Sequence, residues 1–373
     1  MKGLIASFII STTCTSAWAQ IASSSFFPSV RSINPGVAHL RAQALISLDG
    51  SKKDINKNHD ITTGGIVGGV KTDVALQKNT LFGATKGSKV TFEGMFDYET
   101  GEKTEHINST TYGLRNVTNS AKSMYGGGIV DFGLIGLGFA KAKYDTFNRF
   151  RVGSPPDVSA NDFKAEIDYT LLKAGSAYNI NGFTVGAYVM QRVATADYSY
   201  TYYDPQTGAP GSTEVWPAET KSTGYGVGSG FTAKKFRVEA SIEKMAQSDL
   251  EMKENPLELI KAPPESVRLS VAGEMRLGKL SLGARVRQIM GNFADLEDLI
   301  PSNLLYSELS ASDERLETSF NFGWGSDKGI TYSAFFTQST AETEEESTIF
   351  MNGEKYPAKT TSTSYGVNLS YYF

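Results

Sequence analysis

Residues 363–373 read Thr-Ser-Tyr-Gly-Val-Asn-Leu-Ser-Tyr-Tyr-Phe, and they are the last residues of the sequence. Every second side chain from Tyr365 to Phe373 is aromatic or aliphatic, whereas Ser364, Gly366, Asn368 and Ser370 lie between them. A period of two sends these two sets to opposite faces of a β-strand. The stretch therefore predicts a strand with one apolar face and one polar face.

This terminus resembles the closing strand of Gram-negative outer-membrane β-barrels, which typically end in Phe after alternating hydrophobic residues. The resemblance implies an all-β fold, a transmembrane antiparallel β-barrel. It also implies that Tyr371 and Phe373 belong to a signal for the barrel assembly machinery, and that the last strand pairs with the first. Outer-membrane lipid and lipopolysaccharide are then expected partners.

The other end of the sequence has the features of an export signal. Lys2 precedes a short apolar run at residues 4–10, and Ala17-Trp18-Ala19 is a small-residue cleavage site. We expect cleavage after Ala19; a lipoprotein signal at Cys14 is the alternative. The expected organisation is a signal peptide at 1–19, a short periplasmic or plug segment at 20–36, and a barrel at 37–373 in the outer membrane.

Composition excludes several classes of function. Cys14 is the only cysteine, so the exported chain has no disulfide and no thiolate site. The net charge is −4, or −5 once Lys2 is removed, which does not indicate a nucleic-acid partner. No cofactor or metal site is expected, because the three histidines, His39, His59 and His106, do not have metal-ligand spacing.

Alternation and turn residues predict about 14 strands, with short periplasmic turns and long extracellular loops between them. The Asn181-Gly182 pair is the strongest hairpin signal. The predicted strands are 37–48, 61–75, 89–98, 105–117, 125–144, 163–178, 183–203, 222–232, 236–246, 265–277, 280–291, 315–324, 330–340 and 363–373.

The free-energy cost of placing a charge in lipid predicts which face of each strand points into the lumen. An Arg or Lys facing the bilayer midplane costs roughly 2–4 kcal/mol, so charged residues that alternate with apolar ones are expected to face the lumen. Arg268, Arg276, Arg285 and Arg287 would form a basic ladder on neighbouring strands. The expected pore-lining residues are Arg41, Glu93, Asp97, Arg237, Glu239, Arg268, Glu274, Arg276, Arg285, Arg287 and Glu317, with Lys164, Glu166, Asp168 and Glu243 also placed inward.

Residues 125–144 differ from the other predicted strands, because both faces are apolar and glycine recurs within the segment. One interpretation is a long kinked strand with a hydrophobic site; the other is a tightly packed strand with no functional role. A hidden turn would raise the strand number to fifteen or sixteen. The glycines concerned are Gly126, Gly127, Gly128, Gly133, Gly136 and Gly138.

A second resemblance involves Ile33-Asn34-Pro35-Gly36-Val37-Ala38-His39-Leu40, which is similar to the entry into the first strand of the long-chain fatty-acid transporter family. That family has fourteen strands, an N-terminal plug and a kinked strand that opens the wall sideways. The resemblance implies transport of hydrophobic compounds, although residues 20–36 are shorter than that family's plug.

The mixed charges of the expected lumen favour a passive channel for small polar solutes. Two alternatives remain open: the hydrophobic-compound transporter, and a surface adhesin or receptor whose loops bind a partner. Aromatic residues for such binding are Tyr198, Tyr200, Tyr202, Tyr203 and Trp216.

No enzymatic activity is expected. His106, Asn108 and Ser109 have the residue types of a hydrolase but not its spacing. The acidic residues Glu342, Glu344, Glu345 and Glu346 suit either a cation site or a solvated loop. Residues 293–309 have apolar residues near helical spacing and would form a loop helix.

Overall fold

The computed structural model describes residues 45–372, apart from the connections at 64–65, 87–89, 108–116, 132–134, 153–158, 205–206, 208, 248–250, 253–264, 292–313, 326–328 and 347–354. Its regular elements are all β-strands. Among the described residues, no helix is long and apolar enough to cross a membrane.

The first eight strands are long, at 15 to 23 residues each. They are β1 (Leu45–Thr63), β2 (Ile66–Lys86), β3 (Val90–Ile107), β4 (Val117–Asp131), β5 (Ile135–Val152), β6 (Ser159–Ile180), β7 (Phe183–Tyr203) and β8 (Pro210–Thr232).

Five of the remaining seven strands are shorter, and the last two are long again. They are β9 (Phe236–Gln247), β10 (Glu251–Met252), β11 (Glu265–Leu277), β12 (Leu280–Met290), β13 (Glu314–Gly325), β14 (Gly329–Glu346) and β15 (Lys355–Tyr372).

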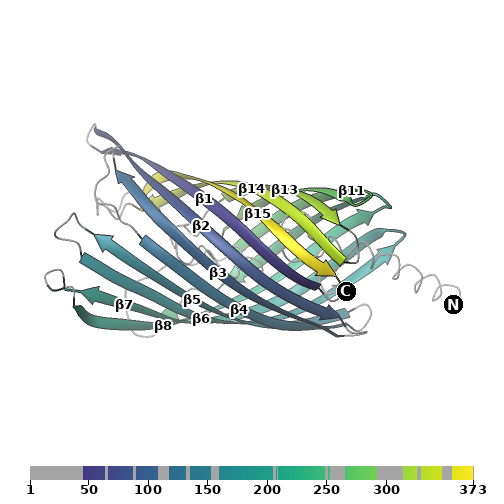
Figure 1. The fold of residues 1–373 in the computed structure, drawn as a ribbon, viewed down its shortest axis with the longest axis horizontal. Helices are drawn as coiled ribbons and strands as arrows, with labels where there is room; N and C mark the ends of the chain where they lie inside the picture. Colours follow the sequence, from purple (N-terminus) through teal and green to yellow (C-terminus); the bar gives the residue numbers. More distant parts are fainter. Residues whose placement is uncertain are drawn as a thin grey trace.

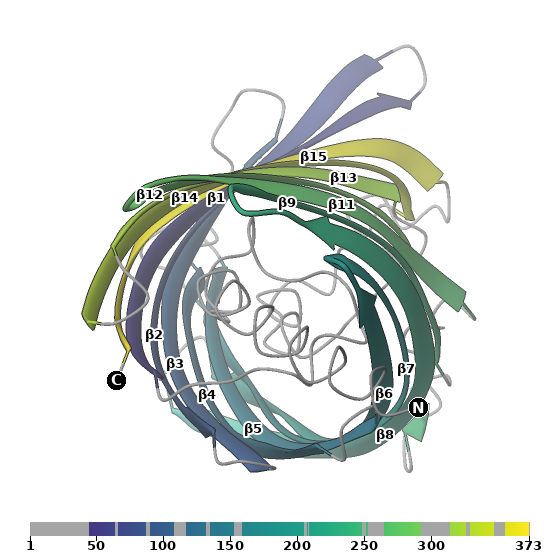
Figure 2. The ribbon, with the colours of Figure 1, turned by 90° about the vertical axis from the view of Figure 1, so that its right-hand side faces the viewer.

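These strands close into a barrel. Each long strand pairs antiparallel with its neighbour in sequence, β1 pairs with β15, and β8 pairs with β9 and so completes the ring. The two-residue β10 only adds a further pairing to β8, so fourteen of the fifteen described strands form the ring. Figure 2 shows the strands surrounding the lumen, and Figure 1 shows β1 beside β15. The predicted antiparallel barrel and its strand number are confirmed.

The β6–β7 hairpin shows how the sequence sets a tight turn. Asn181 and Gly182 both have positive φ, 52° and 87°, as the two central residues of a type I′ turn require. Thr232 of β8 donates a backbone hydrogen bond to Gly182 O at 2.8 Å. A Cβ atom on Gly182 would lie 2.4 Å from Thr232 O, so only glycine fits there.

Three predicted elements are wrong, and two of these errors cancel in the strand count. Residues 49–60, expected as a loop, continue β1 and pair with both β2 and β15. Residues 125–144, expected as one strand, are the β4–β5 hairpin. The expected strand 105–117 contributes only the end of β3 and the start of β4. The predicted kink in a single glycine-rich strand is therefore wrong.

The first of these errors has a simple physical cause. A membrane-spanning β-strand needs about 9–11 residues, and β1–β8 are longer, so their distal halves extend beyond the bilayer. Both faces of a strand are polar there, and apolar alternation no longer marks it.

The two faces of the wall differ as expected across the short strands. Leu269, Val271, Met275 and Leu277 of β11 are exposed outward, whereas Arg268 and Ser270 are buried. On β6 the two faces are reversed. Lys164, Glu166 and Asp168 are exposed on the outer surface, whereas Ile167 and Leu171 are buried. The inward placement of the three charged residues is wrong. They lie on the distal half of β6, where outward charge meets no hydrocarbon.

Candidate functional site

Between residues 224 and 230, strand β8 has no side chains on its inner face. Gly224, Gly226 and Gly228 are buried, while Tyr225 and Val227 point outward. A Cβ atom on Gly224 would lie 2.9 Å from Met190 Cε and 3.2 Å from Lys244 O. Side chains of the flanking strands therefore occupy the space over β8. We refer to Gly224, Gly226, Gly228 and Gly230 as the glycine track.

The register explains which side chains meet over this track. Tyr188 of β7 lies opposite Gly226, and Gly226 lies opposite Glu243 of β9. In the next row, Met190 lies opposite Gly224, and Gly224 opposite Met245. Residues two strands apart thus face one another without an intervening side chain.

A buried apolar cluster lies on this inner face. It is unusual, because the inward positions of a water-filled barrel are polar. Met245 is 0% exposed and Ile289 is 2% exposed. The lumenal apolar cluster consists of Leu171, Tyr188, Met190, Met245 and Ile289.

Polar groups extend from this cluster across neighbouring strands. Lys173 Nζ lies 3.9 Å from the centre of the Tyr188 ring, a cation–π distance. The Tyr188 hydroxyl donates to Glu243 Oε1 at 2.9 Å, and Arg268 Nε donates to Glu243 Oε2 at 2.7 Å. Four strands are thereby connected by side chains across the glycine track.

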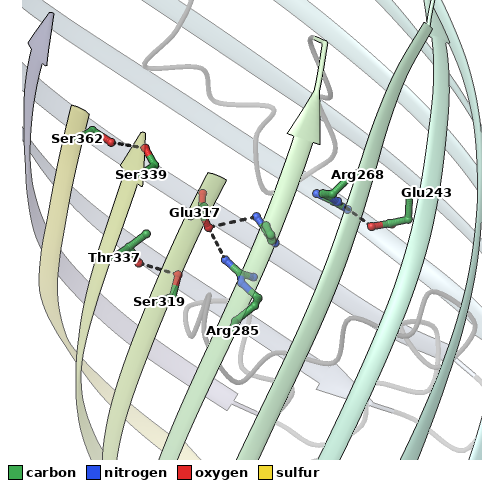
Figure 3. A network of polar contacts seen from close by, with 9 residues as sticks. Glu243, Arg268, Arg285, Glu317, Ser319, Thr337, Ser339 and Ser362 are labelled. Carbon is green, nitrogen blue, oxygen red and sulfur yellow. Dashed lines mark hydrogen bonds and ion pairs between the residues drawn. The ribbon is translucent and has the colours of Figure 1, made fainter. Parts of the chain in front are cut away.

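A second set of buried ion pairs lies on β12 and β13, as Figure 3 shows. Arg285 Nη2 donates to Glu317 Oε1 at 3.0 Å, and Arg287 Nη1 lies 3.8 Å from the same oxygen. Arg285 is 2% exposed. One carboxylate therefore serves two buried guanidinium groups.

Two further predicted charges also pair within β9, since Arg237 donates to Glu239 and both are buried. Glu274 is partly exposed opposite Arg237 in the β9–β11 register. Arg276 lies at the tight-turn end of β11, where its Nε donates to Gly278 O at 3.1 Å. Three of the four arginines of the expected ladder are thus buried together, and Arg276 lies at the rim.

Small neutral polar side chains cover the inner face of β13–β15 and β1. Thr337 donates to Ser319 at 3.0 Å, and the hydroxyls of Ser339 and Ser362 are 2.7 Å apart (Figure 3). The hydroxyls of Ser47 and Ser370 are 2.9 Å apart across the pairing of β1 with β15. These hydroxyls lie mainly on β14, β15 and β1, whereas buried arginines lie on β9, β11 and β12.

The remaining predicted residues divide into two groups. Arg41, Gly133 and Phe373 lie outside the described residues. Glu93 and Asp97 belong to β3, Gly126–Gly128 to β4, and Gly136 and Gly138 to β5, at the inner positions between exposed Ile135, Leu137 and Phe139. Tyr371 is exposed outward on β15.

Residues expected in loops belong partly to strands. His59 and His106 lie in β1 and β3, and the acidic residues 342–346 end β14, where Glu342 pairs with Lys359 at 3.4 Å. Within the described residues, no group of three or more His, Cys, Asp or Glu side chains could hold a metal ion. Residues 293–309 lie outside the described residues, so a loop helix there stays a prediction.

The aromatic side chains expected at a binding surface lie at the distal ends of β7 and β8. The rings of Tyr200 and Tyr202 are 4.5 Å apart in an edge-to-face arrangement, and the Tyr203 hydroxyl donates to Asp162 at 2.7 Å. Tyr198 lies opposite Trp216 in the register. A partner for them stays a prediction.

No protein-family model and no curated protein matches the sequence. Solved structures do match. A Pseudomonas aeruginosa FadL homologue has a TM-score of 0.61 at 13% identity, covering 96% of this chain and 98% of that one. The fold is that of a FadL-type outer-membrane β-barrel. The Pseudomonas putida toluene transporter TodX has a TM-score of 0.55 at 10% identity, over 91% and 93% of the two chains. The Ralstonia pickettii toluene transporter TbuX has 0.51 at 8%, over 91% and 92%.

The glycine track and the lumenal apolar cluster were not singled out from the sequence. The signal was present, since glycine occupies every second position from 224 to 230. Alternating glycine marks a strand face that other side chains cover.

Proposed function

We propose that this chain is an outer-membrane transporter of hydrophobic compounds that works without a chemical step. The lumenal apolar cluster carries the proposal, because it places nonpolar side chains on the inner face of the wall, where a water-filled channel has polar ones. The fold supports it, since two of the similar structures are described as toluene transporters.

The expected channel for small polar solutes has less support. The arginines and glutamates that would line an open aqueous pore are buried and engaged in ion pairs, as for Arg268, Arg285 and Glu243. Charges that solvate one another do not hydrate a pore. None of the similar structures described above is a polar-solute porin.

The test changes the polarity of the cluster without changing its volume. Met190→Gln and Met245→Gln place an amide where a nonpolar compound would bind, and Met190→Leu and Met245→Leu are the matched controls. Full burial of one apolar side chain is worth about 1.5–3 kcal/mol of free energy. A compound that loses this contact should bind more weakly, so we expect uptake to fall roughly tenfold or more.

The measurement is uptake of a radiolabelled monoaromatic or fatty acid by cells that lack their own transporter. Planar-bilayer conductance is recorded in parallel. Equal uptake by the Gln and Leu variants, or ion conductance in the absence of any hydrophobic uptake, contradicts the proposal.

A further inference from the structure

The outer surface of the barrel has a groove where its first and last strands meet. The groove has a volume of about 720 Å³, within the range of ligand pockets, and it crosses β3, β2, β1, β15, β14 and β13. Its large lining side chains, among them Leu48, Phe322 and Trp324, are exposed on the lipid-facing surface. It is therefore separate from the lumenal site.

The register shows why a trough forms there. One straight row across the six strands has an aromatic ring at each end and smaller side chains between them. In order, the row is Tyr98, Asn79, Gly50, Val367, Ala334 and Phe322.

The neighbouring row on the tight-turn side is bulkier. It places Leu48, Leu369 and Tyr332 beside Gly50, Val367 and Ala334, and it ends at Trp324. The row on the other side includes Tyr365 and Phe336. The low row between two higher ones is the floor of the groove, and Gly50 is its deepest position because it has no side chain.

The dimensions of this trough match one lipid chain. Five strand spacings of about 4.8 Å separate Tyr98 from Phe322, roughly 24 Å. Barrel strands tilt by about 35–45°, so a trough at right angles to them crosses roughly 15 Å of depth, about half of a ~30 Å hydrocarbon core. The trough is thus inclined through about one leaflet.

One end of the trough is also placed for a headgroup. Trp324 is the last outward residue of β13 before the short connection to β14, and tryptophan favours the membrane–water interface. We propose that this trough binds one acyl chain of a phospholipid from the leaflet on the tight-turn side, with its headgroup near Trp324. The inference does not depend on the transported compound.

The test fills the trough at its deepest point. In Gly50→Leu, the new side chain begins in open space, since a Cβ atom there meets only Asn79 Oδ1 at 3.4 Å. Gly83→Leu is the matched control, because Gly83 lies on the same outer face of β2 outside the trough and a Cβ atom there meets nothing within 4 Å. Both proteins are refolded in detergent with palmitoyl-oleoyl-phosphatidylethanolamine, and folding is checked by circular dichroism.

Native mass spectrometry then counts the lipids that survive delipidation. We expect the parent protein and Gly83→Leu to retain one phospholipid, and Gly50→Leu to bind it roughly tenfold more weakly, as for the loss of about two buried methylene groups. Equal retention in all three proteins, loss in both variants, or no retained lipid in the parent overturns the proposal. Recovery of the parent as a dimer without lipid also overturns it.

Discussion

At the scale of single residues, the buried charges are the most consequential feature of the inner wall. Glu317 serves both Arg285 and Arg287, whose side chains are almost fully buried. Removing one partner of a buried ion pair leaves the other charge poorly compensated. Such charges specify one arrangement of the wall more than they stabilise it.

Glu317→Ala tests this directly. We expect the free energy of unfolding to fall by roughly 3–5 kcal/mol, the usual cost of breaking a buried ion pair from one side. The measurement is urea-induced unfolding in lipid vesicles, followed by Trp fluorescence.

Glu342→Ala is the matched control, because the Glu342–Lys359 pair is solvent-exposed, at 77% and 59% of the two side chains. Exposed ion pairs contribute little to stability, so the urea concentration at the midpoint of unfolding should stay unchanged. A Glu317→Ala variant as stable as this control would show that the two arginines do not need that carboxylate.

At the scale of single elements, the glycine track explains how β7 and β9 interact across β8. A methyl group on Gly224 would approach the end of the Met190 side chain and a backbone oxygen at once. The Met190 side chain can move, but Lys244 O cannot move without disturbing the pairing of β8 with β9.

Gly224→Val should therefore displace Met190 from the lumenal apolar cluster. We expect a loss of roughly 1–3 kcal/mol in stability from overpacking, together with reduced hydrophobic uptake. Thr223→Val is the control, since Thr223 is exposed on the outer face of the same strand. Equal uptake by the two variants would mean that the cluster tolerates a side chain on the track.

The same scale shows what the sequence can and cannot predict. Alternation correctly predicted the short strands β9 and β11–β13, because one face of each meets lipid over its whole length. It failed at 49–60, where neither face of β1 is apolar, and at 125–144, where apolar residues on both faces concealed the division into β4 and β5. The fourteen-strand total is correct because the extra strand expected at 105–117 offsets the missed division of 125–144 into β4 and β5.

The candidate site was predictable only in part. The inward placement of Arg268, Arg285 and Arg287 follows from the cost of charge in lipid. Their burial depends on how neighbouring strands are paired. Tyr188 and Glu243 are 55 residues apart in sequence, and they meet across a glycine only because of the register of their strands. Periodicity within one strand contains no information on that register.

At the scale of the whole molecule, closure of the barrel depends on the pairing of β1 with β15. The register runs from Leu45↔Tyr372 to His59↔Ala358 without interruption. On the inner face of this seam, Asn368 Nδ2 donates to Ser47 Oγ at 2.5 Å, and Ser370 Oγ donates to Asn368 Oδ1 at 2.6 Å. Residues more than three hundred positions apart are thus joined directly.

The double variant Ser47→Cys with Ser370→Cys tests this closure in the folded protein. The two residues are directly paired, and their hydroxyl oxygens are 2.9 Å apart. Opposed residues of antiparallel strands have Cα separations of about 4.5–5.5 Å, within the range that a disulfide spans. Since Cys14 is the only native cysteine and precedes the expected cleavage site, no other cysteine competes.

Mild oxidation should link the first and last strands into a covalent ring that migrates faster on a denaturing, non-reducing gel and returns to normal migration with reductant. Ser47→Cys with Ser339→Cys is the control, because Ser339 pairs with β13 and β15 and not with β1. It should not cross-link. A folded Ser47→Cys, Ser370→Cys protein that stays unlinked after oxidation would show that β1 and β15 are not in this register, because a slip of one residue turns one of the two cysteines to the lipid-facing side.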